Sequence, residues 1–227
     1  MGVVFRRADL THILGAKDLH HSGDSAQVIV NCTGLGARNL RGCYPSDPNR
    51  QEEDLSKPLG DPTVYPIRGQ IVLVRNSPGI MADTPTRPDN EVTYVMEHAA
   101  GGGCVLGGSY QPNNWESQVD HNLANRIMAR AIKVVPSLVD ERAVKGVSGS
   151  SEGAGTVGGL SIIRHGVGLR PSRQGGVRIE KVRMGDVSVV HQYGHGGAGY
   201  QSSYGSAAKA VQLVRQAVSE RASKARL

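Results

Sequence analysis

The chain has 227 residues, a length that suits one large domain or two small ones and is ample for burying a core. Glycine accounts for 30 residues and aromatic residues for only 4% of the chain, so turns are frequent and the core must be aliphatic. The net charge of +6 comes from scattered Lys and Arg residues without a block of five or six, so we expect no nucleic-acid partner.

The first predicted element is a buried strand in the apolar run 26–34, which ends at Gly-Leu-Gly and leads into a loop. Residues 42–63 are rich in proline and acidic residues, and this composition predicts an exposed segment outside the packed core. Apolar runs at 65–74, 92–96 and 104–110 are separated by turn-rich pieces. They predict short strands of a mostly antiparallel sheet.

Residues 120–138 predict an amphipathic helix, because apolar side chains recur at helical spacing with basic side chains between them. The apolar positions are Leu123, Ile127, Ala131, Ile132 and Val135, and Pro136 lies near the helix end. Residues 146–161 consist largely of Gly and Ser, and they predict a flexible linker without a packed element.

Two further strands are expected around 177–180 and 186–191. The second leads into a glycine-rich loop, 193–201, and then into a helical pattern of apolar residues: Ala207, Ala208, Val211, Leu213, Val214 and Val218. A helix entered from a strand through glycines presents unpaired N–H groups and the positive end of its dipole, which suits an anion or a polarised ligand carbonyl.

Two glycine triplets match the spacing G-x-G-x-x-G of dinucleotide-binding loops. Gly194, Gly196 and Gly199 do lie between a predicted strand and a predicted helix, but only a terminal helix follows, so they open no strand-helix-strand unit. Gly153, Gly155 and Gly158 follow no strand and are assigned to the linker.

Arg170 is a candidate ligand-binding residue, because its planar guanidinium can bind a carboxylate through two parallel hydrogen bonds. A structural or surface arginine is the alternative. Tyr94 and Tyr110 lie at or near the ends of predicted strands, and half-buried aromatic residues with satisfied hydroxyls are the alternative there.

Metal and covalent chemistry find no support in the sequence. The histidines form no i, i+4 pair beside an acid, and no Gly-x-Ser-x-Gly elbow occurs. The three cysteines, Cys32, Cys43 and Cys104, are widely spaced, which implies a reduced intracellular compartment, and Cys32 is expected in the core. No run approaches the roughly 18 apolar residues of a membrane span and no signal sequence is visible, so we expect a soluble, non-secreted chain without a membrane partner.

Five motifs together closely resemble the D-amino-acid oxidase family of flavoenzymes. They are VIVNCTG at 28–34, IRGQ at 67–70, LGGSYQPNNW at 106–115, VGLRPSR at 167–173 and YGHGGAGYQ at 193–201. The resemblance covers the family's C-terminal part. It implies that the N-terminal unit, which binds the ADP half of FAD in the family, is absent and that the chain is truncated.

The resemblance implies a mixed α/β (α+β) fold with a remnant of a Rossmann-like FAD-binding domain and a mostly antiparallel substrate domain. Residues 1–58 would be the partial FAD-binding domain and residues 59–160 the substrate-binding domain. Residues 161–227 would return to the FAD-binding domain with the last strand, the glycine loop and the helix.

The same resemblance assigns roles to residues. Arg170 would pair with the substrate α-carboxylate, with the Tyr94 hydroxyl as second donor. Tyr110 would border the pocket, and backbone carbonyls near Gly197 and Gln201 would receive the substrate amino group. FAD would lie along Leu10, Thr33, Gly34, Gly196, Gly197, Ala198, Gly199, Tyr200 and Gln201.

The implied activity belongs to D-amino acid catabolism: hydride transfer from a D-amino acid to FAD, reoxidation by oxygen to hydrogen peroxide, and hydrolysis of the imino acid to a 2-oxo acid and ammonia. No side-chain base is required, because a clamped carboxylate and amine orient the α-carbon. A D-aspartate oxidase and a non-catalytic truncated remnant that binds a partner through its sheet edge stay open as alternatives. A homodimer also stays open.

The last three residues, Ala225, Arg226 and Leu227, resemble the small-basic-leucine signal that directs proteins to peroxisomes. The alternative is the basic end of a helix in a cytoplasmic protein.

Overall fold

A computed structural model describes residues 3–44, 59–85, 89–98, 102–139 and 159–224. The chain divides into two compact units, Met1–Pro66 with Arg170–Leu227 and Ile67–Leu169. Each unit is described by itself.

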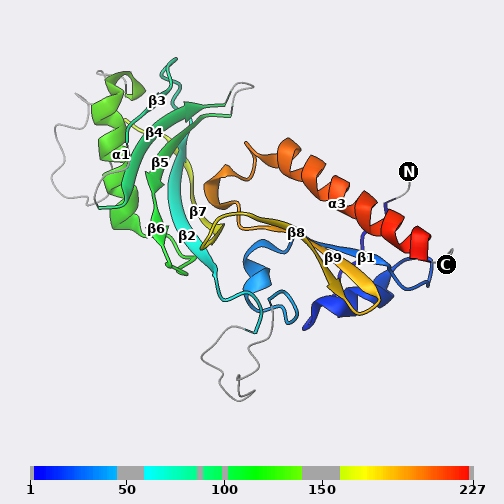
Figure 1. Cartoon of the computed structure of the whole chain (residues 1–227). Coiled ribbons are helices and arrows are strands. Elements are labelled where there is room, and N and C mark those ends of the chain that lie inside the picture. Colours follow the sequence, from blue (N-terminus) through cyan, green and yellow to red (C-terminus); the bar gives the residue numbers. More distant parts are fainter. Residues whose placement is uncertain (1–2, 45–58, 86–88, 99–101, 140–158, 225–227) are drawn as a thin grey trace. The chain divides into compact units, whose positions relative to one another are not determined.

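The first unit is built on a three-stranded sheet of order β1–β9–β8. β1 (Val28–Asn31) runs parallel to β9 (Val187–Tyr193), with Val28 opposite Ser188 and Asn31 opposite His191. β8 (Arg178–Met184) forms an antiparallel hairpin with β9 (Figure 1). The sequence-distant β1 and β9 therefore lie side by side and end at the same edge of the sheet.

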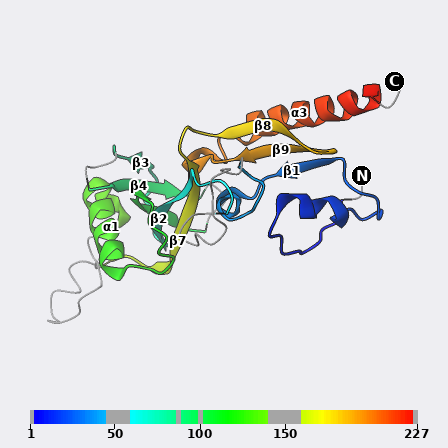
Figure 2. The ribbon, with the colours of Figure 1, turned by 60° about the horizontal axis from the view of Figure 1, so that its bottom comes forward.

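Both faces of this sheet are covered. α3 (Ser203–Lys224) packs on one face through the buried Ser206, Ala210 and Ala217 (Figure 2). On the other face, Ile29, Val187 and Val189 join a core cluster with Ile13 of η1 (Ile13–Leu19) and Ala37 of η2 (Gly34–Arg38). Coverage of both faces explains why β9 is a nearly continuous run of buried residues.

The second unit carries a mostly antiparallel sheet of order β3–β4–β5–β2–β6, with β7 also pairing with β2. The strands are β2 (Val64–Val74), β3 (Ala82–Asp83), β4 (Glu91–Glu97), β5 (Cys104–Ser109), β6 (Gln111–Pro112) and β7 (Ile162–Arg173). The long strands β2 and β7 continue into the first unit.

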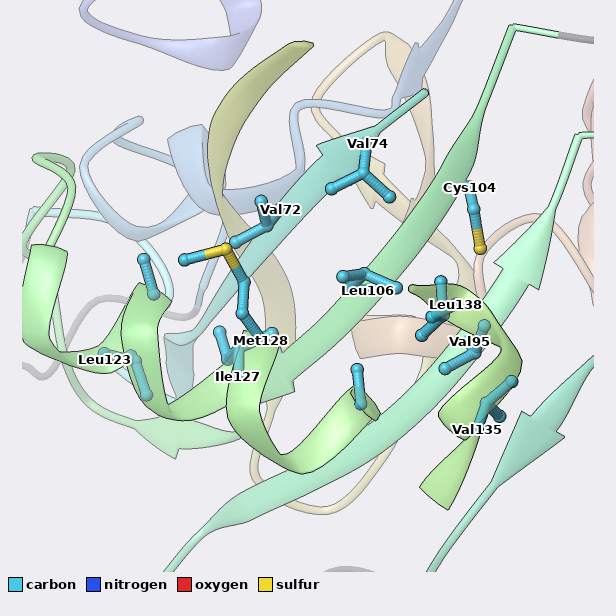
Figure 3. Packing of buried hydrophobic residues seen from close by; sticks show 12 residues of the cluster. Val72, Val74, Val95, Cys104, Leu106, Leu123, Ile127, Met128, Val135 and Leu138 are labelled. Atoms are coloured by element: carbon cyan, nitrogen blue, oxygen red, sulfur yellow. The ribbon is translucent and has the colours of Figure 1, made fainter. Parts of the chain in front are cut away.

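α1 (His121–Val134) covers one face of this second sheet, and its buried side chains Leu123, Ile127 and Met128 meet Val72 and Leu106 of the strands (Figure 3). The side chain of Asp120 caps the helix by accepting a hydrogen bond from the Leu123 N–H at 3.0 Å. The helix ends before Pro136, which begins the short η3 (Pro136–Leu138). The predicted amphipathic helix is confirmed.

A buried arginine holds the segment that leads into α1. Arg68 of β2 donates from Nε to the Glu116 carbonyl at 2.8 Å and from Nη2 to the Gln118 carbonyl and Gln70 Oε1, each at 2.7 Å. The Gln70 side chain in turn donates to the Asp120 carbonyl at 2.7 Å. Among the described residues, the hydrogen-bond acceptors of Arg68 are neutral carbonyl and amide oxygens rather than a carboxylate.

The expected mixed α/β fold with mostly antiparallel sheets is confirmed, as are the strands around 65–74, 92–96, 104–110, 177–180 and 186–191 and the C-terminal helix. The division at residues 58 and 160 stays a prediction. β7 was not expected, because Gly166, Gly168 and Pro171 interrupt any strand pattern; pairing with β2 overrides that local preference.

Several expectations about burial are wrong. In the stretch 42–63, residues 45–58 lie outside the described part, but Cys43, Gly60 and Asp61 are buried instead of exposed. Cys32 is exposed rather than in the core, because it follows Asn31, whose side chain points inward. The strand β1 is only partly buried, since Val30 is 46% exposed.

The predicted linker 146–161 is described only from Gly159 onward, where Leu160 packs against the core of the second unit. The C-terminal tripeptide also lies outside the described residues. Within the described part of the chain, no helix has the length and apolar character needed to cross a membrane.

Candidate functional site

Arg170 lies against the glycine-rich loop that follows β9. Its side chain is half-buried near the end of β7, and its Cδ and Nε atoms lie 3.5 and 3.9 Å from the point where a Cβ atom on Gly197 would stand. The stem of the arginine therefore passes over a residue that has no side chain. This contact lies within the first unit.

The loop approaches β7 so closely that two further positions exclude a side chain. Ser172 forms an isolated antiparallel bridge with His195. Gly196 has φ +57°, and a Cβ on it would lie 2.8 Å from Ser172 Oγ; Gly194 has φ +90°, and a Cβ on it would lie 2.7 Å from Arg173 Cβ. Glycine is required at both positions by conformation and by space.

A third segment reaches the same region from the end of β1. The Thr33 N–H and hydroxyl both donate to Asn31 Oδ1, at 3.1 and 2.7 Å. Gly34, with φ +58°, begins η2, and a Cβ on it would lie 3.5 Å from Pro171 Cβ. The structure therefore brings Thr33, Gly34, Arg170, Gly196 and Gly197 together around the end of β7.

The loop itself is held by local hydrogen bonds on its way into α3. The Ala198 carbonyl accepts from the Ser202 N–H at 3.0 Å and from the Ser202 hydroxyl at 2.8 Å, and the Tyr200 carbonyl accepts from the Ser203 hydroxyl at 2.8 Å. Gly197, Ala198, Tyr200 and Gln201 are exposed, and Gly199 is half-buried. The backbone of this loop is thus ordered and accessible.

The remaining predicted site residues are described within their own units. Leu10 belongs to the first unit, where its side chain lies against Gly15 of η1. Tyr94 and Tyr110 belong to the second unit. The Tyr94 ring covers Gly107 of β5, and Tyr110 is 41% exposed directly after that strand.

A buried ionic cluster that the sequence did not reveal includes Arg173, three residues after Arg170 in β7. The fully buried carboxylate of Asp61 accepts hydrogen bonds at Oδ2 from Arg173 Nε at 3.0 Å and from the Tyr193 hydroxyl at 2.8 Å. At Oδ1 it accepts from the Thr63 N–H at 3.0 Å and from the Thr63 hydroxyl. Arg178 Nη1 lies 3.8 Å from Oδ2.

Burial by itself would raise the pKa of Asp61, but the hydrogen bonds from Thr63, Tyr193 and Arg173 outweigh it, so the pKa lies below its ordinary value. Asp61 is therefore a charged carboxylate between two arginines. No periodic pattern marks this residue, and its position within a proline-rich, acidic stretch argued for exposure. Only the Asp-Pro-Thr sequence, typical of a turn, was available as a signal.

A second buried polar group supports the Thr33 turn. Asn31 Nδ2 lies 3.1 Å from His191 Nδ1 and 3.1 Å from Cys43 Sγ, while its Oδ1 receives the Thr33 donors. Burial, together with the positive charge of Arg178, lowers the pKa of His191 to about 4. Burial also raises the pKa of Cys43 to about 11. His191 and Cys43 are thus neutral near pH 7.

This arrangement can bind an anion. It offers a guanidinium with a fork of N–H donors beside an accessible glycine backbone that leads into a 22-residue helix. Among the described residues, no cluster of three or more His, Cys, Asp and Glu side chains could hold a metal ion.

Comparisons with known proteins cover most of the chain, including the residues of this candidate site. Residues 1–213 match the family model described as FAD dependent oxidoreductase. The D-amino-acid oxidase of Fusarium vanettenii is 45% identical over 216 residues, 94% of this chain and 52% of that protein. The D-amino-acid oxidase of Schizosaccharomyces pombe is 33% identical over 93% of this chain and 52% of that protein.

A D-aspartate oxidase from Cryptococcus neoformans is 33% identical over 83% of this chain and 49% of that protein. The chain thus spans about half the length of the curated relatives it matches. Among solved structures, the glycine oxidase from Geobacillus kaustophilus superposes with a TM-score of 0.57 at 17% identity, over 86% of this chain and 44% of that one. At that identity the likeness concerns the fold alone.

Proposed function

This chain belongs to the family of FAD-dependent oxidoreductases that includes the D-amino-acid oxidases, and from that premise we propose that it binds a D-amino acid for oxidative deamination. The proposed reaction consumes the D-amino acid, oxygen and water, and it yields a 2-oxo acid, ammonia and hydrogen peroxide. The observation that carries the proposal is Arg170 lying across Gly197 at the entrance to α3.

Arg170 is the proposed partner of the substrate α-carboxylate. A guanidinium can form two parallel hydrogen bonds with a carboxylate, which fixes the direction of the substrate as well as its position. Backbone carbonyls near Gly197 and Gln201 would accept from the substrate amino group. We propose the Tyr94 hydroxyl as a second carboxylate donor and Tyr110 as a border of the pocket.

The residues present fit a planar cofactor. Three backbone positions beside Pro171, Ser172 and Arg170 carry no side chain: Gly34 and Gly196, which adopt positive φ, and the exposed Gly197. Thr33, Gly34 and the loop residues Gly196, Gly197, Ala198, Gly199, Tyr200 and Gln201 would hold FAD, with Leu10 alongside. When bound, FAD supplies a hydride acceptor for the substrate α-carbon.

The protein's contribution to this chemistry is orientation. With the carboxylate held at Arg170 and the amino group at the loop carbonyls, the substrate would present one face of its α-carbon to the cofactor. The two enantiomers of the amino acid would thereby be distinguished. No described side chain is needed as a general base, because the amino group loses its proton to solvent and then donates its remaining hydrogen bonds to the backbone carbonyls. Fixed geometry of this kind supplies a large part of the rate of such reactions.

The proposal is tested by titrating the isotopically labelled chain with D-alanine and L-alanine, without and with FAD, by NMR and by the flavin absorption spectrum. We expect D-alanine to bind and R170M to weaken it by about tenfold or more, since a charge-assisted pair is lost. The matched control is R183Q, which removes an exposed arginine of the same unit. Equal affinity of R170M and the native chain for D-alanine would contradict the proposal.

A D-aspartate oxidase is the second candidate, because a relative of that name is 33% identical. Such an activity requires an additional cation for the side-chain carboxylate. A parallel titration with D-aspartate decides between the two: tighter binding of D-aspartate than of D-alanine favours it. A chain that binds neither ligand would favour a non-catalytic interaction protein.

We also propose peroxisomal import through Ala225, Arg226 and Leu227, as fits a family whose proposed product is hydrogen peroxide. A fluorescent protein fused ahead of the chain should colocalise with a peroxisomal marker, and deletion of Leu227 should disperse it. A homodimer is likewise a proposal, which sedimentation equilibrium would test.

A further inference from the structure

The end of β7 presents alternate residues to opposite sides. Because side chains of a strand alternate, Arg170 and Ser172 share one face, and Pro171 and Arg173 share the other. The contacts agree, since Arg170 and Ser172 lie beside Gly197 and Gly196, whereas Arg173 lies beside Gly194 and its Nε reaches Asp61. A shift of one residue would turn Arg170 away from the glycine loop.

The register of β7 rests first on its pairing with β2. Pro171 has no N–H to donate. Beyond that pairing, the end of the strand is held by the bridge between Ser172 and His195 and by the hydrogen bond from the Gln174 N–H to the Thr63 carbonyl, at 2.9 Å. Side-chain contacts of Arg173 add to the alignment on the far side of Pro171 from Arg170.

Asp61 is the strongest of those contacts. Arg173 donates to Asp61 at 3.0 Å, compared with 3.3 Å to the Gln174 carbonyl and 3.4 Å to the Gly176 carbonyl. Arg178, in contrast, also has Glu180 as a carboxylate partner, at 2.6 Å. Loss of the Asp61 charge would thus weaken the hold on Arg173 more than the hold on Arg178.

The backbone of Asp61 is anchored as well. Its N–H donates to the Ala37 carbonyl and the Gly60 N–H donates to the Arg38 carbonyl, each at 2.8 Å. A Cβ on Gly60 would lie 2.1 Å from the Ala37 carbonyl oxygen, so this approach requires glycine. Asp61 therefore connects η2, which begins at Gly34, to the strand that bears Arg170.

We propose that Asp61 is a positioning residue for Arg170: by holding Arg173 on one face of β7, it keeps Arg170 on the other face, across Gly197. The inference rests on the proposed function, which assigns the substrate carboxylate to Arg170. Because Asp61 is fully buried, its proposed role is exerted through Arg173 and not by contact with a ligand.

The test is D61N in the full chain, a substitution that keeps the size and one acceptor oxygen but removes the charge. The first readout is the native-state NMR signals of Arg170 Nε–H and of the Gly196 and Gly197 amides, without ligand. The second is the affinity for D-alanine. We expect the three signals to shift and the affinity to fall by about tenfold. D186N, which removes the exposed pair between Lys17 and Asp186 at 2.9 Å, is the matched control and should change neither.

A merely structural role for Asp61 predicts a lower unfolding midpoint with unchanged native-state signals, and that result would overturn the proposal. Should D61N fail to fold, R173Q decides, because it removes the strand-side partner and leaves Thr63 and Tyr193 on Asp61; it should shift the same three signals. If the native chain does not bind D-alanine, the proposed function fails, but the signals still test the positioning role.

Discussion

The Cδ atom of Arg170 lies 3.5 Å from the point that a Cβ atom on Gly197 would occupy, so the two residues are in contact without any side chain on the loop. This relationship places a guanidinium stem against an exposed backbone at the start of the segment that becomes α3. It joins residues from two motifs that lie 27 positions apart in the sequence.

Gly197 and its neighbour Gly196 should respond differently to alanine. A Cβ on Gly197 meets only ordinary van der Waals contacts, so G197A should change the free energy of unfolding by less than about 0.5 kcal/mol. Gly196 has φ +57° and a Cβ there would lie 2.8 Å from Ser172 Oγ, so G196A should cost about 1–3 kcal/mol. Urea unfolding curves measure both, and equal losses would contradict the described loop conformation.

Gly107 makes room for Tyr94 within the second unit. A Cβ on Gly107 would lie 1.8 Å from Tyr94 Cζ, so G107A must displace the ring, and we expect a loss of about 1–3 kcal/mol in the free energy of unfolding. The double variant Y94A/G107A should recover part of that loss relative to additivity, because the clash is removed. Strictly additive losses would show that the ring and Gly107 do not meet.

Stability should fall on mild acidification because of His191. Burial lowers its pKa to about 4, whereas the unfolded chain takes up this proton near pH 6.5. Between these values the unfolded state binds more protons, so the free energy of unfolding decreases as pH falls, by up to about 1.4 kcal/mol per pH unit. His165, whose pKa is also lowered by burial and by His121, acts in the same direction.

H191Q isolates the contribution of His191. The variant should show a shallower decline between pH 6.5 and about 4 than the native chain when urea unfolding is measured at several pH values, with the comparison at pH 7.5 serving as its baseline. The slope does not vanish, because His165 remains. Identical slopes for both chains would mean that His191 is not buried in its neutral form.

The core of the second unit depends on the contact between α1 and the strands. Ile127 is fully buried among residues such as Val72 and Leu106 (Figure 3). I127A should lower the free energy of unfolding by about 2–5 kcal/mol through lost burial and the cavity left behind. The exposed Val134 at the end of the same helix is the control, and V134A should cost less than about 1 kcal/mol. Similar losses for both would contradict this packing.

Local patterns in the sequence were sufficient for most elements. The period of α1, its Asp120 cap and its end before Pro136 follow from neighbouring residues alone, as do the strands that contain uninterrupted apolar runs. The five motifs were also sufficient to indicate the family, which residues 1–213 match. The secondary-structure patterns and the family motifs can both be read from short stretches of sequence, because each depends on residues that are neighbours in the chain.

The tertiary structure alone decided which side chains are buried and which motifs meet. β7 forms in spite of its glycines and Pro171 because β2 supplies backbone partners. Asp61 is buried against expectation, because Thr63, Tyr193 and Arg173 satisfy its carboxylate. Cys32 is exposed against expectation, because the side chain of its neighbour Asn31 points inward. Tyr193 and Arg173 lie far from Asp61 in the chain and leave no periodic mark in it, so this buried cluster becomes visible only when the chain is folded.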